Sequence, residues 1–243
     1  MRNEGHVWNS AYSTPTYCVT EVAQAVRFMD SFTQYRDADL RIRLLEYIAR
    51  TYSGVEHFAA LEARYAANER RADVLVISDH SHAYEIKSDV DRLDRLPEQL
   101  KDYRRTFDFL TVVTTQTHAC KVKKMLGGND GLIVISDQEA REVRPPKRNK
   151  KIAKKNMVSM CSKSVLIEAL DVGCGTLPLE KVRTLAERKL PLVELRQATF
   201  QELRRRFKDK YDVFLEEACI PYRESDLTLL QHNDRLFTNL LLT

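Results

Sequence analysis

Apolar positions in the first quarter of the chain recur at a helical period. Spacings of three and four residues predict one amphipathic helix over residues 20–35 and a second over residues 39–52. The second predicted helix has Ile42, Leu45 and Ile48 on its apolar side. Residues 55–66 fit either a helix or a strand, and both interpretations stay open.

From about residue 72 the pattern changes to that of β-strands. A β-branched run over residues 72–78 and an alternating run over residues 83–88 flank the turn-forming sequence Asp79-His80-Ser81-His82, which predicts a β-hairpin. Further elements alternate after it: a helix at 97–105, a buried strand at 107–114, a helix at 118–126 and a buried strand at 132–136. This alternation indicates a mixed α/β core.

Beyond Ser162 the pattern is helical only, with helices predicted at 164–170, 179–188, 192–207 and 211–218. Gly173 and Gly175 resemble the glycine-rich loop of methyltransferases. However, helices rather than strand–helix units follow them, so we interpret them as the end of a helix. We therefore divide the chain into an N-terminal helical segment (1–38), an α/β core (39–143), a basic linker (144–155) and a helical C-terminal domain (156–243).

Composition excludes several classes of protein. Only 7 glycines and 7 prolines among 243 residues argue against collagen-like or long disordered chains. No apolar run approaches the roughly 18 residues of a membrane span, and no apolar run follows a basic start as in a secretory signal. The five cysteines are scattered without a Cys-x-x-Cys pair, as is usual for free thiols in a reducing compartment. We expect a cytoplasmic protein with no membrane partner, and a homo-oligomer is left open.

The net charge of +4 is unevenly distributed. Residues 1–140 carry a net charge of −3, residues 156–243 are neutral, and the 15 residues between them hold eight basic side chains and one acidic one. The run includes Lys147, Arg148, Lys150 and Lys151. It fits a solvated linker, or a contact with the phosphate backbone of a nucleic acid that supplies affinity without sequence information.

The candidate catalytic residues lie in the predicted hairpin. If its turn centres on Asp79, then Asp73 lies opposite Glu85, and Lys87 lies one step further on the same face. Two converging carboxylates suit Mg²⁺ or Mn²⁺, which could activate a water next to a scissile phosphate. A register shift of one residue would turn Asp73 to the other face. Charges that alternate on the solvent face of a strand would be the ordinary alternative, but these interrupt strands that otherwise look buried.

A resemblance extends this hypothesis. Residues 71–103 contain three motifs: Tyr84-Glu85-Ile86-Lys87, the Asp91–Gln99 run and the Gln99-x-x-x-Tyr103 pair. Together they resemble the PD-(D/E)XK nuclease superfamily, which has the restriction-endonuclease-like fold. The Gln-x-x-x-Tyr pair is similar to that of its RecB-type branch. More closely, the sequence resembles a largely uncharacterised bacterial family with the signature R-A-D…Y-E-I-K-S-D…R-L-P-x-Q. Ala72 stands where the superfamily name has proline.

The resemblance implies a role for each matching residue. Asp73 and Glu85 would bind the metal, Lys87 would be the catalytic lysine, Gln99 would support the site, and Tyr103 would pack beneath it or contact the nucleic acid. The superfamily adds an upstream acidic residue, for which Glu62 is our choice and Glu56 and Glu69 are alternatives. We assign nucleic-acid contacts to Arg92 and Arg95, which follow the hairpin, and to the four basic residues of the linker named above.

Together, these expectations predict a fold and a function. The resemblance implies a restriction-endonuclease-like mixed sheet flanked by helices, with an all-helical C-terminal extension. It implies a Mg²⁺- or Mn²⁺-dependent phosphodiesterase that acts on nucleic acid, DNA more than RNA. The alternative is a non-catalytic nucleic-acid-binding or regulatory protein on a nuclease fold.

Overall fold

The computed structural model describes residues 34–65, 70–136, 139–171, 173 and 176–231. The helix predicted over residues 20–35, and most of the segment 1–38, lie outside these residues. So do Cys18 and Cys174. The three described cysteines (Cys120, Cys161 and Cys219) are free thiols, as expected.

Strands of the described residues form one six-stranded sheet in the order β1-β2-β3-β4-β5-β6. They are β1 (Phe58–Tyr65), β2 (Arg70–Ile77), β3 (Ser81–Lys87), β4 (Phe109–Thr115), β5 (Gly131–Ile135) and β6 (Ala140–Arg144). The first three pair antiparallel, β3, β4 and β5 pair parallel, and β6 pairs antiparallel with β5. The predicted α/β class with a mixed sheet is therefore confirmed.

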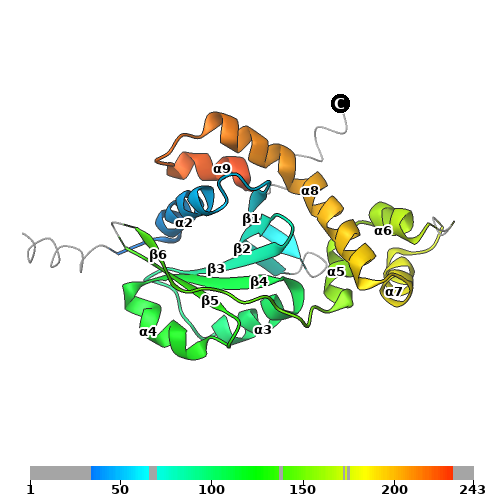
Figure 1. The fold of residues 1–243 in the computed structure, drawn as a ribbon, viewed down its shortest axis with the longest axis horizontal. Helices are drawn as coiled ribbons and strands as arrows, with labels where there is room; N and C mark the ends of the chain where they lie inside the picture. The colour runs from blue at the N-terminus through cyan, green and yellow to red at the C-terminus, as the bar shows by residue number, and fades with distance from the viewer. Residues whose placement is uncertain (1–33, 66–69, 137–138, 172, 174–175, 232–243) are drawn as a thin grey trace, which may run out of the picture. The chain divides into compact units, whose positions relative to one another are not determined.

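Helices cover both faces of this sheet (Figure 1). They are α2 (Asp37–Thr51), α3 (Leu96–Thr106), α4 (Gln116–Met125), α5 (Lys154–Met160), α6 (Lys163–Leu170), α7 (Leu179–Lys189), α8 (Leu192–Glu217), the 3₁₀ turn η1 (Glu224–Asp226) and α9 (Leu227–Leu230). α2 contacts β3, β4 and β6, whereas α3 and α4 contact β4, and α4 also contacts β5.

Alternation along β3 explains why both faces are covered. Tyr84 points to the α2 side, where it hydrogen-bonds His82, which in turn contacts Tyr52 at the end of α2. Glu85 points the opposite way and accepts a hydrogen bond from Tyr103 of α3. Successive side chains of a strand project to opposite faces, so a strand buried on both faces can carry a core tyrosine next to a carboxylate.

Helices of the C-terminal part pack on one another and on the sheet. α8 contacts α5, α6 and α9, and it also contacts the edge strand β1. None of the described helices is long and apolar enough to cross a membrane. Although α8 has 26 residues, it carries charged side chains along its length.

Several local predictions need correction. The ambiguous residues 55–66 contain a strand, β1, and the unpredicted strand β6 follows β5. β6 lies at the sheet edge with charged, exposed residues at its centre, so it lacks an apolar pattern. α5 begins at Lys154, inside the predicted linker.

The helices predicted at 192–207 and 211–218 are one continuous helix, α8. The residues between them are polar but favour helix, and Lys208 pairs with Asp212 one turn later at 2.7 Å. The end of α6 also differs from the prediction. Asp171, with φ of 47°, takes the left-handed position that we had given to the glycines. Gly175 lies outside the described residues.

Candidate active site

The β2–β3 hairpin has the predicted register. Val74 pairs with Tyr84 and Ile77 with Ser81, which centres the turn on Asp79 as proposed. Beyond Val74 the ladder ends. There the Asp73 side chain takes the place of a backbone acceptor, and its Oδ2 receives the Ile86 amide at 2.8 Å. The two strands therefore separate where the carboxylates stand.

Glu85 is the most enclosed group of the site, with 1% of its surface exposed. The Tyr103 hydroxyl donates to its Oε2 at 2.6 Å. Lys87 Nζ lies 2.7 Å from the other oxygen, Oε1. That oxygen nevertheless has no hydrogen-bond donor among the described residues, so the contact with lysine is an ion pair only.

The pKa of Asp73 reflects its burial beside Glu85. Burial, followed by the charge of Glu85, raises the pKa of Asp73 to about 8. The Ile86 amide and the Arg41 guanidinium act in the opposite direction, and Glu62 adds to the increase. Two carboxylates in one desolvated place disfavour each other's ionised form, and a nearby cation would relieve this.

A divalent cation is what the resemblance implies, and the oxygens present fit one. Glu85 Oε1 is buried without a donor, and Asp73 accepts its hydrogen bond through Oδ2 alone. Mg²⁺ is commonly bound through one or two carboxylates and keeps several waters. The described part of the chain holds no group of three or more His, Cys, Asp or Glu side chains that could hold a metal ion. The fit thus rests on the two carboxylates.

Glu62, the predicted third acidic residue, lies on β1 and is paired with arginines. It has a φ of 52° and interrupts the β1–β2 pairing between Leu61 and Ala63. Its carboxylate pairs with Arg41 of α2 and, at 3.3 Å, with Arg71 of β2. Whether it can turn to a metal stays a prediction.

Of the two alternatives to Glu62, the structure describes only Glu56. Glu56 forms an exposed ion pair with Arg204 of α8 at 2.9 Å. Glu69 lies outside the described residues. The structure thus brings together Asp73, Glu85 and Lys87, and the hydroxyl of Tyr103 hydrogen-bonds Glu85.

The sequence reading missed Arg41. This arginine is 8% exposed and joins α2 to Glu62 on the sheet. Its pattern was visible, because Arg41 stands at helical spacing from the buried Leu44, Leu45 and Ile48. A charge on the apolar side of an amphipathic helix usually has a buried partner, and here that partner sits beside the carboxylate site.

A hollow of about 390 Å³ opens beside the site. Its lining combines three basic side chains with aromatic, amide and acidic ones: Tyr65, Arg70, Arg71, Arg95, Glu98, Gln99 and Tyr103. The predicted pair Gln99 and Tyr103 therefore shares one hollow with Arg95. The side-chain oxygen of Gln99 is buried and has no hydrogen-bond partner among the described residues.

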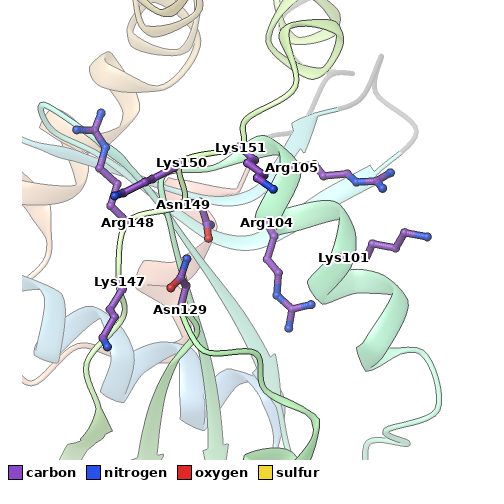
Figure 2. Close-up of a pocket in the computed structure, with 9 residues that line it drawn as sticks. All are labelled: Lys101, Arg104, Arg105, Asn129, Lys147, Arg148, Asn149, Lys150 and Lys151. Carbon is purple, nitrogen blue, oxygen red and sulfur yellow. The ribbon is translucent and has the colours of Figure 1, made fainter.

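The other predicted nucleic-acid contacts lie elsewhere. Arg92 lines a second hollow of about 500 Å³ with residues of α4, and it pairs with Asp94 at 2.6 Å. The four basic residues of the predicted linker line a third hollow, together with Lys101, Arg104 and Arg105 of α3 (Figure 2). The six predicted residues are thus distributed over three hollows.

Residues 30–231 match the family model described as bacteriophage P4 protein cII. The chain belongs to this family. The matched range includes the hairpin carboxylates, the basic linker and most of the helical part. Within the P4 cII family, Protein cII of Enterobacteria phage P4 is 30% identical over 98 residues, which is 40% of this chain and 37% of that relative. The match thus spans little more than a third of that relative's length.

A solved structure also shows a limited similarity. It is the SPO1766 protein of unknown function from Silicibacter pomeroyi, which is 19% identical, with a TM-score of 0.34. The alignment covers 44% of this chain and 72% of that one. At this TM-score the similarity carries no conclusion about fold or function.

Proposed function

We propose that this protein is a metal-dependent nuclease that hydrolyses phosphodiester bonds, of DNA more than of RNA. The observation that carries the proposal is the meeting of Asp73 and Glu85 where β2 and β3 separate, with Lys87 Nζ 2.7 Å from Glu85. The resemblance to the PD-(D/E)XK superfamily assigns metal binding and catalysis to the same three residues. Its restriction-endonuclease-like fold is compatible with the mixed sheet seen here.

Each side chain has a distinct part in this proposal. Asp73 and Glu85 would hold Mg²⁺ or Mn²⁺, with Glu62 and the Ile86 carbonyl as further candidates. A bound divalent cation would supply an acidified water and offset the charge of the phosphate. Tyr103 fixes the orientation of the Glu85 carboxylate through its 2.6 Å hydrogen bond. The ammonium of Lys87, 2.7 Å from Glu85, would hold the attacking water.

Hydrolysis then requires a phosphate near this group. The water gives up a proton as its oxygen forms a bond to phosphorus, the bond from phosphorus to the leaving sugar oxygen breaks, and the leaving oxygen takes up a proton. Arg71 and Arg95 line the adjoining hollow. Guanidinium groups there can hold the non-bridging oxygens by paired hydrogen bonds.

A cleavage assay tests the proposal. Linear, circular and single-stranded DNA, and RNA, are incubated with the wild-type protein, Asp73→Asn or Lys87→Met in Mg²⁺ or Mn²⁺. Asp79→Asn is the matched control, because it makes the same change in the exposed turn of the same hairpin. We expect cleavage by the wild-type protein and by the control only. Equal cleavage by all four proteins would assign the activity to another site or to a contaminant.

A second candidate is a non-catalytic nucleic-acid-binding or regulatory protein on this fold. The observation that favours it is the Lys87–Glu85 ion pair, which already offsets one buried carboxylate without a metal. Titration calorimetry with Mg²⁺ and Mn²⁺ separates the two candidates. Nucleic-acid binding by a protein with no affinity for either ion and no cleavage would favour the second.

A further inference from the structure

The largest of the three hollows described above is strongly basic. It has a volume of about 780 Å³, and we call it the basic groove. Nine residues line it: Lys101, Arg104, Arg105, Asn129, Lys147, Arg148, Asn149, Lys150 and Lys151. Seven carry a positive charge, two are amides, and none of the nine is acidic or aromatic. Figure 2 shows α3 on one side, the segment 147–151 on the other, and Asn129 between them.

Two of the seven cations already have partners. Arg104 binds both oxygens of the buried Asp130. Arg148 pairs with Asp108 at 3.3 Å, and Asp108 also binds Arg196 of α8.

The remaining five cations are available for a ligand. They are Lys101, Arg105, Lys147, Lys150 and Lys151, and none of them has an ion pair within the described part of the chain. Five unpaired charges around one hollow repel one another, so the free protein gains nothing from placing them together. A polyanionic ligand would benefit from the arrangement.

The backbone holds this wall of the groove in place. The Lys147 amide donates to the Asn129 carbonyl at 2.8 Å, and the Asn149 amide donates to the Asp108 carbonyl at 2.7 Å. The buried Asn149 side chain also donates to the Phe107 carbonyl at 3.0 Å. A further bond of 2.9 Å joins Ala153 to the Arg105 carbonyl. The cations are therefore carried by a backbone that is already ordered, which lowers the entropic cost of binding.

The groove and the carboxylate site lie on different faces of α3. Gln99 and Tyr103 stand four residues apart and line the hollow beside the carboxylates. Lys101 and Arg105 are also four residues apart, offset by two, which is about 200° around a helix. The two hollows share no lining residue.

We propose that the basic groove binds the phosphate backbone of a nucleic acid, at a site separate from the carboxylates and independent of any metal. Five cations on two walls match a chain of phosphates better than a single phosphate group. A concave site does not match the flat surface of a bilayer. Without an aromatic side chain to stack on bases, the groove reads the backbone and not the sequence. The inference does not require the proposed nuclease activity.

Fluorescence anisotropy in EDTA tests it, with labelled duplex DNA, single-stranded DNA and RNA of random sequence over a range of salt. We expect the logarithm of the association constant to fall linearly with the logarithm of the salt concentration, with a slope of roughly −4 to −5 for five duplex contacts. The variant Lys147→Gln/Lys150→Gln/Lys151→Gln should bind at least about tenfold more weakly, with a slope shallower by roughly 3. The preferred nucleic acid identifies the natural ligand class.

The matched control is Lys181→Gln/Arg188→Gln/Lys189→Gln, which removes the same charge from exposed positions of α7. It should bind like the wild-type protein. Equal weakening by the groove variant and the α7 control would overturn the proposal, since net charge alone would then explain it. Absence of binding to all three nucleic acids would overturn it too. Because EDTA removes the metal, failure of the nuclease assay leaves this result unaffected.

Discussion

The carboxylate site and the basic groove lie on two faces of the same helix but are built in opposite ways. At the carboxylate site, Glu85 is enclosed and touches both a lysine and a tyrosine. In the groove, five cations face solvent without a counter-charge among the described residues. Buried charges interact strongly and must be compensated one by one, whereas exposed charges act nearly independently and are screened by salt. The first arrangement suits a chemical step and the second suits affinity.

The largest expected effect separates the two regions by function. Lys87→Met should reduce metal-dependent cleavage by about 10²- to 10⁴-fold, because the group that holds the water is lost. Nucleic-acid binding in EDTA should stay at the wild-type level. Lys123→Met, an exposed change on α4, is the control for both measurements. If binding and cleavage fell together in the folded variant, the two regions would be one site.

The next prediction concerns the helix that the regions share. Leu100 of α3 is fully buried, so Leu100→Ala should lower the free energy of unfolding by about 2–5 kcal/mol. Cleavage and binding should both decline at temperatures where part of the protein unfolds. Urea unfolding followed by circular dichroism gives the stability. A loss below about 1 kcal/mol would mean that α3 packs less tightly than its burial indicates.

A smaller loss of stability and of binding should follow from a change beside the basic groove. A side chain at Gly131 would clash with the Thr111 hydroxyl and approach Pro146 Cδ to 3.0 Å. Gly131→Ala should therefore cost about 1–3 kcal/mol of stability and displace the segment that carries Lys147. Gly128→Ala is the matched control, since nothing lies within 4 Å of its added carbon. Equal behaviour of the two variants in unfolding and in DNA binding would contradict the close packing of Pro146.

A further effect distinguishes the regions by the response of their stability to pH. With a pKa of about 8 when folded, against 3.8 as the ordinary value, Asp73 keeps its proton in the folded chain where the unfolded chain has lost it. Stability should therefore fall as pH rises from about 4 to about 8, relative to Asp73→Asn. Urea unfolding in EDTA at pH 5 and pH 8 measures the difference, and Mn²⁺ should reduce it at pH 8. Parallel changes in the two proteins would argue against a raised pKa of Asp73 in the folded chain.

Much of the site could be predicted from the sequence because it is local. The β2–β3 turn is short, and alternation fixes the faces, so the register of Asp73 against Glu85 followed from counting residues. The spacing of Gln99 and Tyr103 likewise placed both on one side of α3. The partners that are distant in sequence could not be predicted. Nothing local connects Arg41 to Glu62, because α2 reaches β1 only through tertiary packing.

The basic linker shows the same limit. Its charge was evident, but its prolines and lysines gave no sign that it would be fixed to the loop at Asn129 and to α3. Those bonds join residues far apart in sequence, and they turn an apparent spacer into one wall of a groove. Lys101 and Arg105 form the other wall, and their sequence context is that of an ordinary solvated helix face.

By itself the sequence determined the α/β class and the hairpin, and it singled out the three residues of the proposed chemistry. Periodicity and short turns specify local pairing, and burying a charge is costly enough to mark its position. Only the tertiary structure decided that Glu62 pairs with two arginines and that the predicted nucleic-acid contacts divide among three hollows. It also decided that the basic segment is anchored against α3. Such pairings depend on how distant elements pack, and the side chains carry no local pattern that specifies them.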